Sequence, residues 1–198
     1  MSEPLRRIER DGLVSRDTPP MRLLVDPTMS HLESTRLVIK RIARAERHYF
    51  VETREGEVRR MLVAQFEGFL DDNDETYRYP LPDPVEMGGE TWGSWIFCYS
   101  LAAGEAPETT DTIEVMRRHA LALDDELVMA RYARIVEPDA RHEVLVFYTE
   151  PLRPLGHSLA SASASVDGEL RPEYSALGTE LKARARRAFR VTADADGG

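Results

Sequence analysis

Runs of strand-forming residues separated by very short turns constrain this chain more than any other feature. Residues 126–136 (ELVMARYARIV) and 141–150 (RHEVLVFYTE) are joined only by residues 137–140, which include a proline. Two further runs, 47–53 and 58–66, flank a Gly-bearing turn. Strands joined by tight turns pair antiparallel, because parallel neighbours need a long crossover connection. The chain is therefore predicted to form a mainly antiparallel sheet.

Other segments add helices to this pattern. Residues 21–25 and the aromatic run 91–101 (TWGSWIFCYSL) are predicted strands. Ser30 and Glu33 have the spacing of a capping box, which predicts a helix from His31 to about Arg44. Two more helices are predicted, at 111–122 and from Pro172 to about residue 189, because their apolar residues recur at helical spacing.

These elements predict an α+β fold in a single domain over residues 21–191. A curved, mainly antiparallel sheet of about six strands, approaching a barrel or a cone, is expected to be packed by two to three helices. Residues 1–20 are polar and end in Thr-Pro-Pro, which predicts a flexible N-terminal arm. Residues 192–198 are predicted to be a disordered tail, and the low-complexity stretch 157–170 a mobile connection.

Charge and cysteine content exclude several classes of protein. The formal charge of −9 over 198 residues repels phosphate backbones and anionic lipid, so neither nucleic acid nor a membrane is expected as a partner. The single cysteine, Cys98, cannot form an internal disulfide, which favours a reducing compartment. No apolar run has the length of a membrane span or the position of a secretion signal. A cytoplasmic location is expected.

Motifs for cofactors and metals are missing from the sequence. It contains no GxGxxG, no GxxxxGK[ST], no GxSxG, no HExxH and no CxxC. His48 and Glu52 share a predicted strand face, but at about 13 Å they are too far apart to ligate one metal ion. Neither a cofactor nor a metal is therefore predicted.

Aromatic residues on the predicted strands indicate a candidate ligand site. Strand side chains alternate between faces, so Trp92 lies on one face of its strand and Trp95 on the other. His142 shares an otherwise apolar strand face with Tyr148 and Glu150, which makes His142 a candidate general acid or base, although a solvated strand end has the same pattern. The same aromatic residues also suit a plain core, and both interpretations stay open. The candidate ligand-binding residues are Trp92, Trp95, Tyr99, Arg131, Tyr132 and Tyr148, with Arg131 as an orienting charge.

The leading hypothesis is a domain that binds a small apolar or aromatic molecule in an aromatic-lined cavity. It either binds only or catalyses a step that needs no cofactor, such as an isomerisation or a cyclisation. The alternative is a protein-interaction or assembly module without catalytic activity, suggested by the polar arm, the connector and the basic closing helix. A homo-oligomer with the aromatic strand at a subunit interface is a third arrangement.

Overall fold

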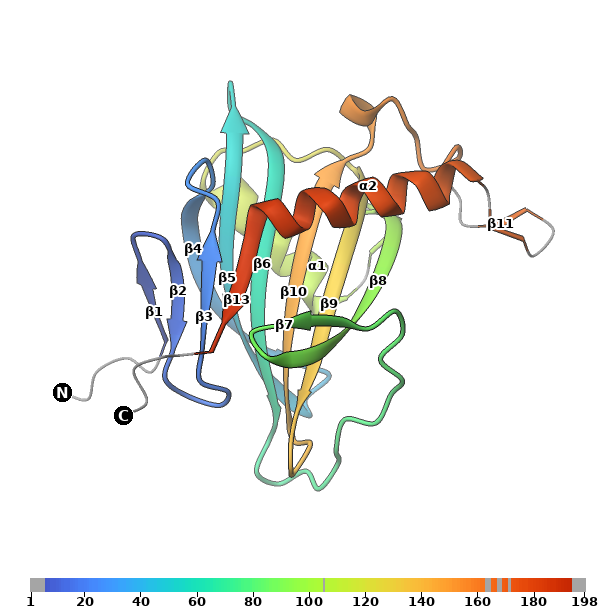
Figure 1. Cartoon of the computed structure of the whole chain (residues 1–198). Helices are drawn as coiled ribbons and strands as arrows, with labels where there is room; N and C mark the ends of the chain where they lie inside the picture. Colours follow the sequence, from blue (N-terminus) through green and yellow to red (C-terminus); the bar gives the residue numbers. More distant parts are fainter. Residues whose placement is uncertain (1–5, 105, 163–164, 167–168, 171, 194–198) are drawn as a thin grey trace.

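The computed structural model describes residues 6–104, 106–162, 165–166, 169–170 and 172–193, and Figure 1 shows its arrangement. The larger sheet contains β4 (Ser30–Ile39), β5 (Ala43–Arg54), β6 (Glu57–Phe69), β7 (Val85–Met87), β8 (Glu90–Ser100), β9 (Glu126–Val136) and β10 (His142–Pro151). The smaller sheet contains β1 (Arg6–Glu9), β2 (Gly12–Ser15), β3 (Met21–Val25) and β13 (Phe189–Thr192). The remaining elements are α1 (Pro107–Arg118), the 3-10 turn η1 (Arg153–Leu155), the short pair β11 (Ser165–Val166) and β12 (Glu169–Leu170), and α2 (Pro172–Ala188).

The larger sheet confirms the antiparallel prediction in outline. Its strand order is β4-β5-β6-β10-β9-β8-β7, and every neighbouring pair is antiparallel. The two predicted hairpins are β5–β6 and β9–β10, and the aromatic run forms β8. In the described part of the chain β4 and β7 are the edges, so the sheet does not close into a barrel. Two helices pack on a two-sheet framework, where a single sheet of about six strands was expected.

Residues 6–9 and 12–15 form strands, within the segment 1–20 that is predicted to be a flexible arm. From Arg6 on, they build the hairpin β1–β2, which continues into β3. Gly12 makes this possible because its φ is +146°, and an added Cβ would lie 1.9 Å from the Leu23 carbonyl oxygen. Leu13 and Val14 are buried, so this hairpin is part of the core.

The helix predicted from His31 to about Arg44 is also wrong, because these residues form β4 and the start of β5. They pair with each other through a turn in which Lys40 and Arg41 both have positive φ, as type I′ hairpin turns require. The local capping-box pattern is overridden by the ladder of hydrogen bonds to β5. The other two predicted helices exist: α1 begins at Pro107, earlier than expected, and α2 begins at Pro172.

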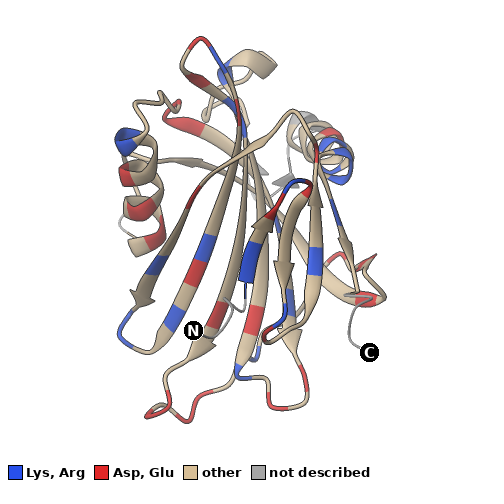
Figure 2. Cartoon of the chain, turned by 90° about the vertical axis from the view of Figure 1, so that its left-hand side faces the viewer, with Lys and Arg blue, Asp and Glu red and all other residues tan. Residues whose placement is uncertain are grey.

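The two faces of the larger sheet are covered differently. On one face the smaller sheet and α2 pack against the sheet and bury a continuous apolar core. On the other face α1 lies beside β4 and covers a smaller apolar cluster that includes Tyr49, Val63 and Met116. Figure 2 shows α1 and α2 on opposite sides of the sheets, with acidic residues along α1 and basic residues on α2.

The rest of the chain adds few constraints on the site. Among the helices in the described part of the chain, none combines the length and apolar character needed to cross a membrane. The mobile connection predicted at 157–170 lies partly outside the described residues. The predicted disordered tail at 192–198 begins at the last residue of β13 and lies outside the described residues from 194 on.

Candidate functional site

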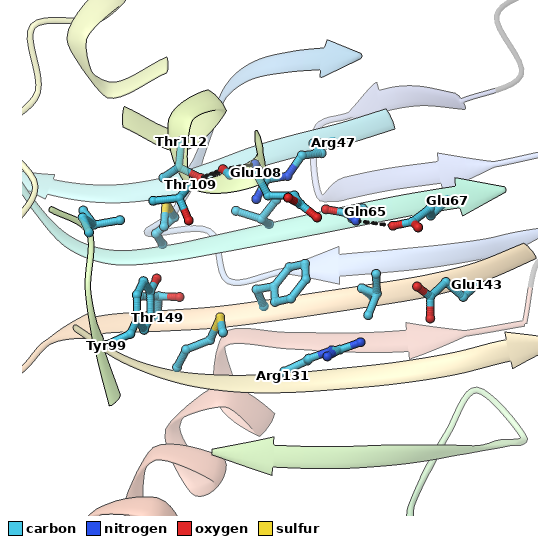
Figure 3. Close-up of a pocket in the computed structure, with 16 residues that line it drawn as sticks. Arg47, Gln65, Glu67, Tyr99, Glu108, Thr109, Thr112, Arg131, Glu143 and Thr149 are labelled. Carbon is cyan, nitrogen blue, oxygen red and sulfur yellow. Dashed lines mark hydrogen bonds between the residues drawn. The ribbon is translucent and has the colours of Figure 1, made fainter. Parts of the chain in front are cut away.

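A cavity of about 350 Å³ lies on the α1 side of the larger sheet (Figure 3). Strands β5, β6, β8, β9 and β10 contribute side chains to it, and the first turns of α1 form a wall. Its apolar lining residues are Met61, Val63, Leu101, Met129, Leu145 and Phe147. Its polar lining residues are Arg47, Gln65, Glu67, Tyr99, Glu108, Thr109, Thr112, Arg131, Glu143 and Thr149. We call this space the α1-side cavity.

Strand alternation and register bring these side chains together. Alternate residues of β6 and β10 point to the same side of the sheet. The register places Glu67 opposite Glu143, and Val63 opposite Phe147. The α1-side cavity therefore has a carboxyl end, where the two glutamates lie, and an apolar middle.

The carboxyl end is held by the proline-rich loop at 70–84. Directly opposed residues on antiparallel strands have Cβ atoms about 4.5–5.5 Å apart, so Glu67 and Glu143 are close neighbours. The Tyr77 hydroxyl donates to Glu67 Oε1 at 2.8 Å, and the Tyr79 hydroxyl donates to Glu143 Oε2. These phenol hydrogen bonds orient both carboxyl groups.

Burial changes the acidity of this pair. Burial, and secondarily the charge of Glu67, raises the pKa of Glu143 to about 7, against the opposing effects of the Tyr79 hydroxyl and of Arg131. The pKa of Glu67 is also raised, chiefly by burial. A carboxyl group with a pKa near 7 can accept or release a proton at neutral pH. The carboxyl end therefore has the acidity that general acid–base chemistry requires.

Arg131 is the basic residue nearest this end. Its guanidinium carbon lies 5.0 Å from the centre of the Trp95 ring and 5.9 Å from that of Tyr79. These cation–π contacts hold the guanidinium against two aromatic rings beside the carboxyl pair. Its charge partly opposes the rise in the pKa values of Glu143 and Glu67.

A second polar network fixes α1 to the sheet at the other side of the cavity. Arg47 Nη1 donates to the Glu108 carbonyl oxygen at 2.7 Å and to Asp111 Oδ2 at 3.2 Å. The Tyr49 hydroxyl donates to the same Asp111 oxygen at 2.7 Å. Arg47 and Tyr49 are both buried, so this network is a structural anchor that sets the position of the α1 wall.

Gln65, the only glutamine in the chain, lies in the wall of the α1-side cavity. Its side chain is buried, with the residue only 1% exposed, and its Nε2 donates to Glu67 Oε2 at 2.8 Å. Its Oε1 has no hydrogen-bond partner among the described residues. Buried polar atoms nearly always have a hydrogen-bond partner. An unpaired acceptor in a cavity wall therefore indicates a position at which a bound molecule could donate a hydrogen bond.

The structure does not bring the six predicted ligand-binding residues onto one surface. Tyr99 and Arg131 line the α1-side cavity, and Trp95 supports Arg131 from the same face. Trp92, Tyr132 and Tyr148 are at most 1% exposed and lie in the core on the opposite face. For these three residues, the plain-core interpretation describes their surroundings.

His142 lies away from the α1-side cavity. It pairs with Gly68, and its imidazole crosses that glycine so closely that an added Cβ would lie 2.6 Å from Cδ2. It lines a separate cavity of about 570 Å³ near β1. Arg6 in that cavity forms ion pairs with Asp17 and Glu46, so much of its charge is already neutralised. A general acid or base role for His142 stays a prediction.

Sequence reasoning missed the carboxyl end. Its residues alternate along strands that read as apolar, and the pairing of Glu67 with Glu143 depends on a register that sequence leaves open. The available signal was the interruption of two apolar strands by Gln65, Glu67 and Glu143. Among the described residues, no group of three or more His, Cys, Asp or Glu side chains could hold a metal ion.

Comparison with protein-family models, curated proteins and solved structures finds no significant match. The class of this protein is therefore defined by its own architecture. It is a sheet-rich α+β protein in which two antiparallel sheets and α2 enclose one core, and α1 and the larger sheet border a polar-ended cavity.

Proposed function

We propose that this protein binds a small amphipathic molecule in the α1-side cavity. The observation that carries the proposal is the buried Oε1 of Gln65, which has no hydrogen-bond partner in the described part of the chain and lies in the wall of a cavity of about 350 Å³. Ligand cavities of a few hundred Å³ typically combine an apolar lining with a few polar groups that fix orientation. Here the apolar middle would contact the body of the ligand, and the carboxyl end would orient its polar group.

The apolar middle supports this assignment because it is incompletely covered. Met129 and Phe147 are half-buried although both lie near the centre of the larger sheet. Residues at such positions are normally covered, and covering them by a ligand would remove further apolar surface from water. Of the predicted aromatic residues, Tyr99 lines this cavity, and Phe147, which was not predicted, is the other aromatic residue in its lining.

A cavity-filling variant tests the proposal. Met129→Trp would fill the apolar middle, and Phe97→Trp is the matched control because Phe97 lies on the same sheet face, is 38% exposed and does not line the cavity. Native mass spectrometry of freshly purified protein, followed by titration with apolar and amphipathic probes, is expected to show binding to wild type and Phe97→Trp but not to Met129→Trp. Equal binding to all three proteins, or none to any, would contradict the proposal.

A second candidate function is cofactor-independent acid–base catalysis in the same cavity. The observation that favours it is Glu143, whose pKa is raised to about 7 at a wall that a bound molecule would contact. Once a retained ligand is identified, its incubation with protein in D₂O, followed by NMR, would reveal exchange of a carbon-bound proton. Glu143→Gln is expected to abolish such exchange, and exchange that persists in this variant would exclude Glu143 as the base.

The contacts of α2, the closing helix, give little support to the alternative of a protein-interaction module. Lys182 bonds to Asp83 and Ser94, and Arg184 donates to Glu150 at 2.8 Å, so part of the basic charge of α2 is used within the chain. The alternative stays a prediction, as does a homo-oligomer. Sedimentation of the purified protein tests the oligomer directly.

A further inference from the structure

The carboxyl end of the α1-side cavity is rich in hydrogen-bond acceptors. Gln65 Oε1 has no hydrogen-bond partner among the described residues. Glu67 fixes the orientation of the Gln65 amide, because an ionised carboxylate can only accept hydrogen bonds and therefore requires the amide nitrogen to face it. Figure 3 shows Glu108 reaching from the start of α1 toward Gln65. Glu108 also raises the pKa of Glu67, so the two carboxylates repel each other across the cavity.

The charges at this end do not cancel. Arg47 is already paired with Asp111, which leaves Arg131 as the basic lining residue that faces the carboxyl pair. Three lining glutamates against this one guanidinium make a formal excess of two negative charges when all are ionised. Like charges held together in a buried site are unfavourable unless one of them is protonated or a cation joins them.

The shape of the lining separates charge from apolar surface. Along β6 the lining runs from Met61 and Val63 to Gln65 and Glu67, and on β10 Phe147 lies beside Val63. A molecule lying along these strands would meet methionine and aromatic side chains at one end and carboxylates at the other. Methionine sulfur and phenylalanine rings both pack well against an aromatic ring.

We propose that the ligand of the α1-side cavity is a cationic amine with an apolar or aromatic body, whose ammonium group is held by Gln65, Glu67, Glu108 and Glu143. This inference rests on the proposed function, because it names the chemical class of the molecule bound there. An ammonium group has three N–H donors and a positive charge. It can donate a hydrogen bond to the Gln65 amide oxygen and offset the excess negative charge of the carboxylates.

Three indole compounds with the same body test the charge of the ligand. Tryptamine carries an ammonium group, tryptophol a neutral hydroxyl and indole-3-propionate a carboxylate. Isothermal titration of the full chain at pH 8 is expected to show tryptamine binding at least about tenfold more tightly than the other two, since a charge-assisted hydrogen bond contributes about 1.5–3 kcal/mol. Glu67→Gln is expected to remove most of this preference, while Glu114→Gln, an exposed change of the same charge on α1, leaves it intact.

The affinity for tryptamine is also expected to depend on pH through Glu143. The titratable and charged groups around Glu143 are Glu67 on β6, Tyr77 and Tyr79 in the loop and Arg131 on β9. Since the pKa of Glu143 is raised to about 7, its ionised fraction rises about tenfold from pH 6 to pH 8, and the affinity should rise by about the same factor. Glu143→Gln should bind tryptamine with little pH dependence in this range.

The outcomes separate this inference from the proposed function. Equal binding of tryptamine and tryptophol, blocked by Met129→Trp, would overturn the amine and keep the cavity as a binding site. Preferred binding of indole-3-propionate would also overturn it and assign the polar end to Arg131. If none of the three compounds binds and the purified protein retains no molecule, both proposals fail.

Discussion

The two faces of the larger sheet are built from the same strands and have opposite characters. Trp92, Tyr132 and Tyr148 on the closed face are sealed under the smaller sheet and α2. Phe147 and Met129 on the α1 side are half-buried, and polar residues surround them. Since side chains alternate along each strand, both faces carry large apolar residues. The comparison shows that aromatic content does not distinguish a core from a binding surface, whereas the layer packed over the face does.

The largest expected effect tests whether the closed face carries most of the stability. Trp92→Ala should lower the free energy of unfolding by about 3–5 kcal/mol, because it opens a cavity in a sealed core and removes the hydrogen bond from Nε1 to the Met87 carbonyl oxygen. Phe147→Ala on the α1 side should lower it by only about 1–2 kcal/mol, because that ring is already half-exposed. Urea denaturation followed by circular dichroism measures both. Equal losses would mean that the two faces are equally packed.

The carboxyl end should give an intermediate, pH-dependent effect. The pKa of Glu143 is raised to about 7 in the folded protein, above the ordinary value of 4.5, so folding favours its protonated form. The contribution of Glu143 to wild-type stability therefore falls as pH rises from about 4.5 to about 7 and stays low above that. Glu143→Gln removes this titration and should be more stable than wild type by about 1–3 kcal/mol at pH 8, with the difference shrinking toward pH 5.

The control for this titration is Glu114→Gln, an exposed change on α1. Its stability relative to wild type should not vary between pH 5 and pH 8. Urea midpoints at both pH values measure the two variants together. A Glu143→Gln variant with no pH-dependent gain would show that the carboxyl group is ionised at little cost, and would weaken the acid–base candidate.

The smallest expected effect concerns unpaired polar atoms on the two faces of the larger sheet. The Tyr132 hydroxyl is buried without a hydrogen-bond partner among the described residues, in the core between the larger sheet, the smaller sheet and α2. Tyr132→Phe should leave the free energy of unfolding unchanged or raise it by up to about 1 kcal/mol, and should not change ligand retention. Tyr148→Phe should instead cost about 1–2 kcal/mol, because the Tyr148 hydroxyl donates to Glu150 Oε1 at 2.6 Å.

These two tyrosine variants also test how the unpaired oxygen of Gln65 is interpreted. If Tyr132→Phe reduced ligand retention, an unpaired buried atom would not distinguish the α1-side cavity from the core. The measurements are thermal unfolding and native mass spectrometry on both variants. Tyr148→Phe is expected to be less stable than Tyr132→Phe, and neither variant is expected to change ligand retention.

Much of the fold could be predicted because it depends on local pattern. The hairpins β5–β6 and β9–β10, strand β8 and helices α1 and α2 follow from alternation, short turns and helical spacing. The residues of β4 favour a helix in sequence because Ser30 and Glu33 have the spacing of a capping box. The turn that follows β4 carries Lys40 and Arg41 at positive φ, where Gly or Asn would indicate a hairpin. The strands β1 and β2 carry little pattern because each has only four residues.

The sequence by itself determined which side chains share a strand face, since that depends only on the two-residue period of a strand. This period alone puts Tyr99 on the same strand face as Trp95, and Tyr148 on the same strand face as His142. Only the tertiary structure decided which face is closed, that Glu67 meets Glu143, and that a loop brings Tyr77 and Tyr79 over them. These facts depend on register and on packing between segments far apart in the chain, and neither is encoded in the spacing of neighbouring residues.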